Sequence, residues 1–164
     1  MALIIEDGSI VAGADSFATV AEFATYAAKY GRSVTDDAEA VESLLRRAAL
    51  QMDALDWKGT TVSRDQPLSW PRYGVIIEGW EYPSNVVPAK VKSGQMALAA
   101  EIYADDSAPD DLKPGPIIRE KVGPLETEYG DAPRSVSKPV TARQSQAFFT
   151  GYVESSASVG LVRA

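Results

Sequence analysis

Residues 36–55 read DDAEAVESLLRRAALQMDAL, and this stretch decides the fold class. Its apolar side chains recur at helical spacing and fall on one face; they are Val41, Leu44, Leu45, Ala48, Met52 and Leu55. Asp36 or Asp37 can cap the helix, because an aspartate side chain accepts hydrogen bonds from the free amides of the first turn. Glu42 and Arg46 are four residues apart on the outer face, so they are expected to pair. The stretch predicts an amphipathic helix packed on a core.

Two further helices are predicted on either side of this one. Thr19 and Glu22 have the spacing of a capping box and Gly31 fits a C-cap, which predicts a helix from about 20 to 30. Pro88 is acceptable as a first helical residue, and the pattern continues as a helix to about 104. The second half of that helix is apolar on most sides apart from Glu101, so we expect it at the centre of the bundle.

The rest of the chain is expected to be less regular. Residues 57–88 hold seven prolines and glycines and all three tryptophans, so a continuous helix is excluded there and a long loop is predicted. Residues 117–130, IIREKVGPLETEYG, predict two short strands as a hairpin or extended arm. After residue 131 the sequence is rich in Ser, Thr, Pro and Ala, with a marginal helix around 144–152.

These patterns predict a mainly α fold in two parts. Residues 1–130 form a bundle of three to four helices with an N-terminal arm, the Trp/Pro-rich loop and the hairpin or arm. Residues 131–164 form an extended C-terminal docking tail.

Composition narrows the classes of function. The 164 residues include no cysteine and no histidine, which excludes thiolate nucleophiles, disulfides, Ser-His-Asp triads and the usual zinc and haem ligands. The sequence therefore predicts no catalytic residues, no cofactor and no metal. The net charge of −7 argues against general attraction to phosphate, and no apolar run approaches the length of a membrane span.

The densest unusual feature is the aromatic loop, defined here as residues 57–73. Its distinctive residues are Trp57, Lys58, Gly59, Gln66, Trp70, Pro71 and Arg72. Two interpretations are open. The rings can cover and pin the helical core, with Arg72 stacked or paired to an acid. Alternatively Trp57, Trp70 and Tyr73 can stack on bases of single-stranded nucleic acid while Arg72 pairs with phosphate.

The order of several segments resembles the head-tail adaptor proteins of tailed bacteriophages over about residues 5–130. The segments are EDGSIVAGADSF (6–17), TVAEFATYAAKYG (19–31), LLRRAALQMDAL (44–55), DWKGTTVSRDQPLSWPR (56–72), VPAKVKSGQMALAAEIY (87–103) and REKVGPLETEY (119–129). WKG, QPLSWPR and KVGPLETEY are the more specific parts. One branch of these adaptors is labelled as DnaT-like single-stranded DNA binding proteins.

The resemblance implies a non-enzymatic virion protein at the neck, assembled in the host cytoplasm. Copies of the chain, commonly twelve, would form a ring between the portal protein and the tail or stopper protein, and DNA would pass through without specific binding. Trp70 and Arg72 would hold the loop on the bundle. The hairpin and tail would reach neighbours through Lys121, Val122, Gly123, Pro124, Leu125, Tyr129, Phe148, Phe149, Tyr152, Leu161 and Arg163. No membrane partner is implied.

Overall fold

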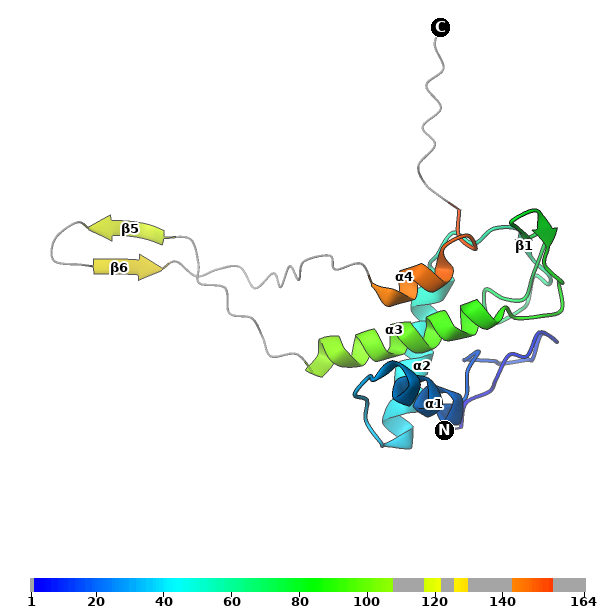
Figure 1. Cartoon of the computed structure of the whole chain (residues 1–164), viewed down its shortest axis with the longest axis horizontal. Helices are drawn as coiled ribbons and strands as arrows, with labels where there is room; N and C mark the ends of the chain where they lie inside the picture. Colours follow the sequence, from blue (N-terminus) through cyan, green and yellow to red (C-terminus); the bar gives the residue numbers. More distant parts are fainter. Residues whose placement is uncertain (1, 108–116, 122–125, 130–142, 155–164) are drawn as a thin grey trace, which may run out of the picture. The chain divides into compact units, whose positions relative to one another are not determined.

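A computed structural model of the chain describes residues 2–107, 117–121, 126–129 and 143–154. The elements follow in the order α1 (Val20–Tyr30), α2 (Ala38–Asp53), β1 (Thr60–Thr61), β2 (Arg72–Tyr73), β3 (Ile76–Ile77), β4 (Trp80–Glu81), α3 (Ala89–Ser107), β5 (Ile117–Lys121), β6 (Glu126–Tyr129) and α4 (Gln144–Phe149) (Figure 1). The predicted mainly α class with a short hairpin is confirmed. The chain divides into a helical unit, residues 1–106 with 142–164, and a hairpin unit, residues 107–141.

Helix α1 begins and ends where its local signals predict. The Thr19 hydroxyl accepts a hydrogen bond from the Glu22 amide at 3.1 Å, and the Glu22 carboxylate accepts one from the Thr19 amide at 2.7 Å. Gly31 adopts a left-handed conformation, φ 61°, and its amide bonds back to the last turn. Both predicted caps are therefore present, and they fix the bounds of the helix without help from the rest of the chain.

Helix α2 is the amphipathic helix predicted from residues 36–55. The Asp37 carboxylate caps it by accepting from the Glu39 amide at 3.2 Å. Its buried face consists of Val41, Leu44, Leu45, Ala48, Ala49 and Met52. The predicted pair of Glu42 and Arg46 is present at 3.5 Å, and Arg46 also meets Asp15 at 2.6 Å. Arg46 therefore fastens the N-terminal segment to α2.

Helix α3 lies at the centre of the helical unit, as predicted, and starts one residue after Pro88. Its buried residues are Val91, Gly94, Gln95, Ala97, Leu98, Ala99, Ala100 and Ile102. The fully buried Gln95 amide accepts from the Phe17 amide at 3.0 Å and donates to the Leu45 carbonyl at 2.9 Å and the Ser16 hydroxyl at 3.0 Å. One side chain thus ties the N-terminal segment, α2 and α3 together.

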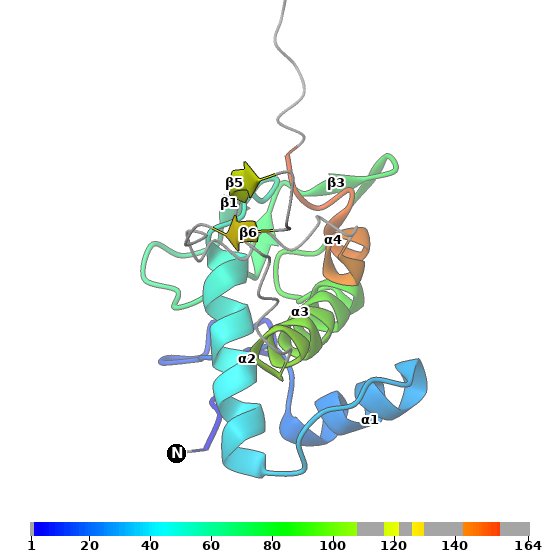
Figure 2. The same cartoon turned by 90° about the vertical axis from the view of Figure 1, so that its left-hand side faces the viewer.

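Residues 143–154 differ from the extended tail predicted after residue 131. Helix α4 lies beside α3 (Figure 2), and these residues belong to the helical unit. Phe149 and Tyr152 are buried in the same core as α2 and α3, which corrects their prediction as residues of a subunit or portal interface. The Lys58 amide donates to the Tyr152 carbonyl at 2.9 Å, so the segment is also hydrogen-bonded to the aromatic loop. Burying two large rings outweighs the weak helical signal of the sequence.

The hairpin unit contains the predicted strand pair. Strands β5 and β6 are antiparallel, with Lys121 opposite Glu126 and Ile117 opposite Tyr129. Lys121 and Tyr129 therefore end the two strands, as the predicted hairpin requires. The other predicted interface positions of the arm and tail, residues 122–125, 161 and 163, lie outside the described residues.

Candidate functional site

Trp57 and Trp70 form the buried centre of the aromatic loop. Trp70 is fully buried and Trp57 is 5% exposed, and their rings meet edge to face with centroids 5.7 Å apart. The Trp57 indole donates to the Met52 carbonyl at 2.8 Å, where α2 ends. The rings of Phe149 and Tyr152 pack against them, at 5.3 Å from Trp57 and 5.9 Å from Trp70. Both tryptophans pin the core, so neither presents a face on which a base can stack.

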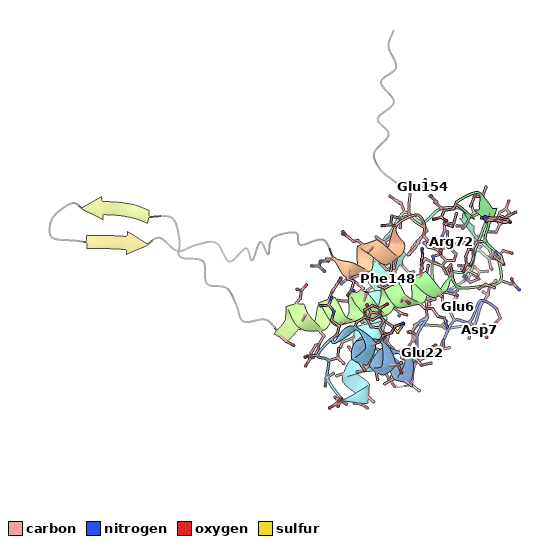
Figure 3. All side chains as sticks on the ribbon, viewed as in Figure 1. Glu6, Asp7, Glu22, Arg72, Phe148 and Glu154 are labelled. Carbon is pink, nitrogen blue, oxygen red and sulfur yellow. The ribbon has the colours of Figure 1, made fainter. Side chains whose placement is uncertain are left out.

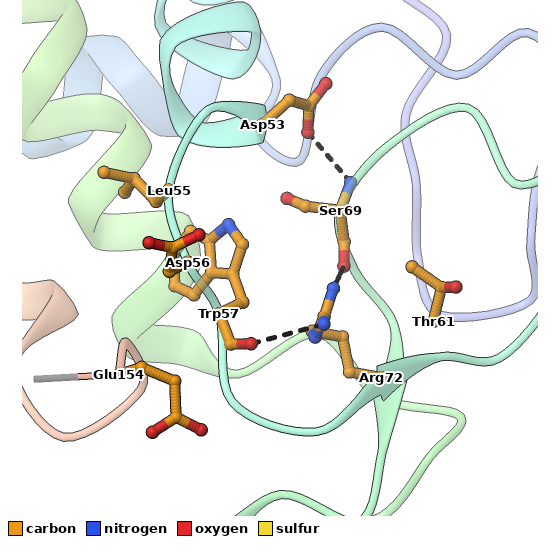
Figure 4. A pocket seen from close by; sticks show the side chains of 8 residues that line it. All are labelled: Asp53, Leu55, Asp56, Trp57, Thr61, Ser69, Arg72 and Glu154. Carbon is orange, nitrogen blue, oxygen red and sulfur yellow. Dashed lines mark hydrogen bonds between the residues drawn. The ribbon is translucent and has the colours of Figure 1, made fainter. Parts of the chain in front are cut away.

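Arg72 holds the loop closed through backbone carbonyls. Its guanidinium donates to the carbonyls of Gly59 at 2.7 Å, Lys58 at 2.8 Å, Ser69 at 3.2 Å and Trp57 at 3.3 Å. Figure 4 shows the bonds to Ser69 and Trp57. The sequence predicted an aromatic or acidic partner, whereas the carbonyls of two loop segments take this role. Burial lowers the pKa of Arg72, but an arginine stays protonated at neutral pH. These bonds use four of the five N–H donors of the guanidinium, so Arg72 has little capacity left to bind phosphate.

Three other residues of the aromatic loop, Gln66, Pro71 and Gly59, have structural roles that depend on their residue types. The Gln66 amide donates to the carbonyls of Leu68 at 2.7 Å and Pro71 at 3.1 Å, which closes the turn before Trp70. Pro71 is fully buried and follows a cis peptide bond. Gly59 has φ 71°, and a Cβ atom there would collide with the Tyr73 carbonyl oxygen. Only glycine fits this position.

Replacing Arg72 tests whether it anchors the loop. We expect Arg72→Met to lower the free energy of unfolding by about 1.5–3 kcal/mol, because hydrogen bonds of a charged donor are lost and partly buried carbonyls are left unpaired. Arg72→Lys should not restore stability, since an ammonium group cannot reach carbonyls on both segments as a planar guanidinium does. Urea unfolding measures both variants, and a Lys variant as stable as the parent would refute the anchoring role.

An acidic pocket of about 490 Å³ lies beside the anchored loop (Figure 4). Its lining comprises Asp53, Leu55, Asp56, Trp57, Thr61, Ser69, Arg72 and Glu154. The Asp53 carboxylate accepts from the Ser69 amide at 2.9 Å. Within the described ranges, no group of three or more acidic side chains is placed to hold a metal ion. Three carboxylates against one occupied arginine make the pocket unfavourable for phosphate.

The hairpin of β3 and β4 carries an exposed tryptophan, Trp80, that the sequence does not predict as a functional residue. Trp80 is 80% exposed and Ile76 of β3 is 59% exposed, whereas Tyr73, 60% exposed, lies on β2 and is already among the residues predicted to stack on bases. Glu78 and Gly79 link the strands with φ 52° and 86°, as a two-residue hairpin turn requires. The sequence signal for this hairpin is the Glu-Gly pair between Ile77 and Trp80. The prediction of a single long loop over residues 57–88 does not take this pair into account.

Together these features define a small, mainly α protein whose two loop tryptophans are buried and whose third tryptophan, Trp80, is exposed on the β3–β4 hairpin. Among the helices of the described residues, none is long and apolar enough to cross a bilayer. The chain belongs to the family described as putative DnaT-like ssDNA binding protein, whose model matches residues 1–164. That agrees with the branch label in the sequence resemblance and does not address the adaptor role. The chain has no significant match among curated proteins or solved structures.

Proposed function

We propose that the chain is a non-enzymatic structural protein, a head-tail adaptor of a tailed bacteriophage. In this role its copies form a ring, expected to contain twelve, that extends the DNA channel at the neck. The ring joins the portal protein to the tail or stopper protein. Assembly takes place in the host cytoplasm, and the mature protein resides in the virion.

The observation that carries this proposal is the hairpin unit inserted between α3 and α4. Among the residues of this unit that the structure describes, β5 and β6 form an antiparallel pair of five and four residues, in a unit distinct from the helical one. An isolated two-stranded hairpin is marginal in water, so it gains stability when another surface covers it. A neighbouring subunit supplies such a surface in a closed ring.

The acidic charge is consistent with the same role. Sixteen basic against 23 acidic residues give a net charge of −7, which disfavours adhesion to DNA moving through a channel. The aromatic loop supports the proposal indirectly. Trp57 and Trp70 are buried in the core of the chain itself, so they are not available to stack on DNA bases.

Imaging and mass photometry with the portal protein of the same genome test the adaptor role. We expect a ring with a central channel, formed alone or on the portal. Each contact can be too small to hold free copies together, so assembly on the portal is the decisive condition. A protein that stays monomeric and ignores the portal at micromolar concentration would overturn the proposal.

Binding of single-stranded nucleic acid is the second candidate, and the family match favours it. The residues first suggested for it need correction, because Trp57 and Trp70 are buried and the guanidinium of Arg72 is occupied. Tyr73, 60% exposed, is the one of the four that remains accessible. A labelled oligothymidine titrated at increasing salt tests this candidate: salt-sensitive binding that Tyr73→Ala weakens would favour it over the adaptor role.

A further inference from the structure

The tip of the β3–β4 hairpin presents an apolar ring with an acidic rim. Ile77 and Trp80 are paired across the strands, next to the two-residue turn. Trp80 is the most exposed large apolar side chain in the described part of the chain, and Glu78 and Glu81 flank it. Exposed tryptophan is a frequent anchor of protein interfaces. Two neighbouring carboxylates make the tip unfavourable for phosphate and favourable for a basic-rimmed pocket.

A pocket with complementary character lies between α1 and α3. Its volume is about 390 Å³, and its apolar wall is formed mainly by Tyr26, Tyr30 and Met96. Lys29 and Glu22 also line it; Lys29 approaches the Tyr30 ring, with Nζ 5.7 Å from the centroid, and the Glu22 carboxylate is paired with Lys92. We call this pocket the α1–α3 groove. A tryptophan ring suits an aromatic groove with a cation at its edge.

Other contacts keep the groove in shape. The Phe148 ring packs edge-on against both Tyr26 and Tyr30, with centroids 6.4 Å away in each case. Lys92 of α3 meets Glu22 of α1 at 4.0 Å, across the same pair of helices. Phe148, one of the residues predicted from sequence to lie at an interface, therefore supports the groove from α4.

The tip and the groove lie apart on the helical unit. In Figure 2 the β3 hairpin is at the upper end and α1 at the lower end. In Figure 3 the labelled Arg72, at the start of β2, lies above α3, whereas Glu22 of α1 lies below it. Two different complementary patches on one chain are what a head-to-tail contact between identical subunits requires.

We propose that Trp80 at the hairpin tip of one copy inserts into the α1–α3 groove of a second copy. The Glu78 and Glu81 carboxylates then face Lys29 at the groove edge. This inference rests on the proposed ring function and adds the subunit contact. The contact is heterologous, so it propagates around a ring and leaves no unpaired patch when the ring closes.

Site-directed cross-linking tests the contact directly, because the chain has no native cysteine. Glu81→Cys places a thiol beside the tip, and Thr25→Cys places one on the exposed side of α1 in the groove. The two full-length variants are mixed and oxidised. Leu50→Cys, on an exposed position of α2, is the matched control partner. We expect a dimer from Glu81→Cys with Thr25→Cys, and little from Glu81→Cys with Leu50→Cys.

Adding Trp80→Ala to the Glu81→Cys protein should abolish the specific dimer. Loss of a hot-spot tryptophan weakens association by roughly 30-fold, while the helical circular dichroism stays unchanged. Equal cross-linking to both partners, or a yield that Trp80→Ala leaves intact, would overturn the contact. The contact would also be overturned if Trp80→Ala abolished binding of oligothymidine but left the cross-linked dimer intact. That result would assign Trp80 to binding of nucleic acid.

The outcomes also separate this contact from the adaptor role. A ring that forms on the portal with Trp80→Ala protein keeps the proposed function and rejects the contact. Absence of any wild-type ring rejects the proposed function, and the cross-link then decides whether copies still associate through the tip.

Discussion

Trp70→Ala is expected to lower the free energy of unfolding by about 3–5 kcal/mol, the range for deleting a large buried ring. Trp70 has no exposed surface, and its ring meets those of Trp57 and Tyr152 edge to face. Alanine would leave a cavity where the loop, α2 and the segment after α4 converge. Urea unfolding followed by circular dichroism measures the loss.

Trp80→Ala is the matched control, because it removes the same side chain from an exposed position. Its effect on the free energy of unfolding should stay within about 0.5 kcal/mol, as for most surface substitutions. Similar losses from both variants would contradict the assignment of Trp70 to the core and Trp80 to the surface. The pair therefore separates a structural tryptophan from one that can bind a partner.

Local sequence signals were sufficient to predict where α1 begins and ends and where α2 begins. The Thr19–Glu22 box, Gly31 and the Asp37 cap act within one or two turns, so the bounds of α1 and the start of α2 can be predicted from nearby residues, while packing of the apolar faces stabilises the helices. The β5–β6 hairpin was equally local, because its strands lie close together in the sequence. The structural interpretation of Trp57 and Trp70 follows from ring size and proline content, and both rings are buried. The partners of Arg72 could not be predicted in this way, because they are backbone carbonyls rather than a ring or an acid.

Contacts between residues far apart in the chain could not be predicted from the sequence. The apolar rings of α4 indicate burial without indicating the surface that buries them, so the sequence alone predicts Phe149 at a subunit or portal interface. Its actual position depends on Gly94, which is 55 positions earlier in the chain and carries no side chain to reveal the contact. The exposure of Trp80 is a different case: the Glu78–Gly79 pair indicates a hairpin turn, but it does not indicate whether the tryptophan that follows is exposed or buried.

Gly94→Ala is expected to destabilise the protein, although alanine normally stabilises a helix interior by about 1 kcal/mol relative to glycine. A Cβ atom at position 94 would collide with Cε1 of Phe149 and lie 2.8 Å from Cδ1 and Cζ. The ring cannot move away easily, because it is 5% exposed and packs against Trp57. Overpacking of this kind costs about 1–3 kcal/mol. The measurement is the free energy of unfolding in urea.

A double-mutant cycle with Phe149→Ala isolates the contact between α3 and α4. Phe149→Ala alone should cost about 3–5 kcal/mol by leaving a cavity. In the double variant the methyl group introduced at position 94 occupies space vacated by the ring, so the clash disappears and the helix-forming advantage of alanine returns. The combined loss should fall below the sum of the single losses by at least about 1 kcal/mol, beyond the scatter for independent sites. Additive losses would mean that Phe149 does not rest on Gly94. The burial of α4 in the helical unit would then need a different packing partner on α3.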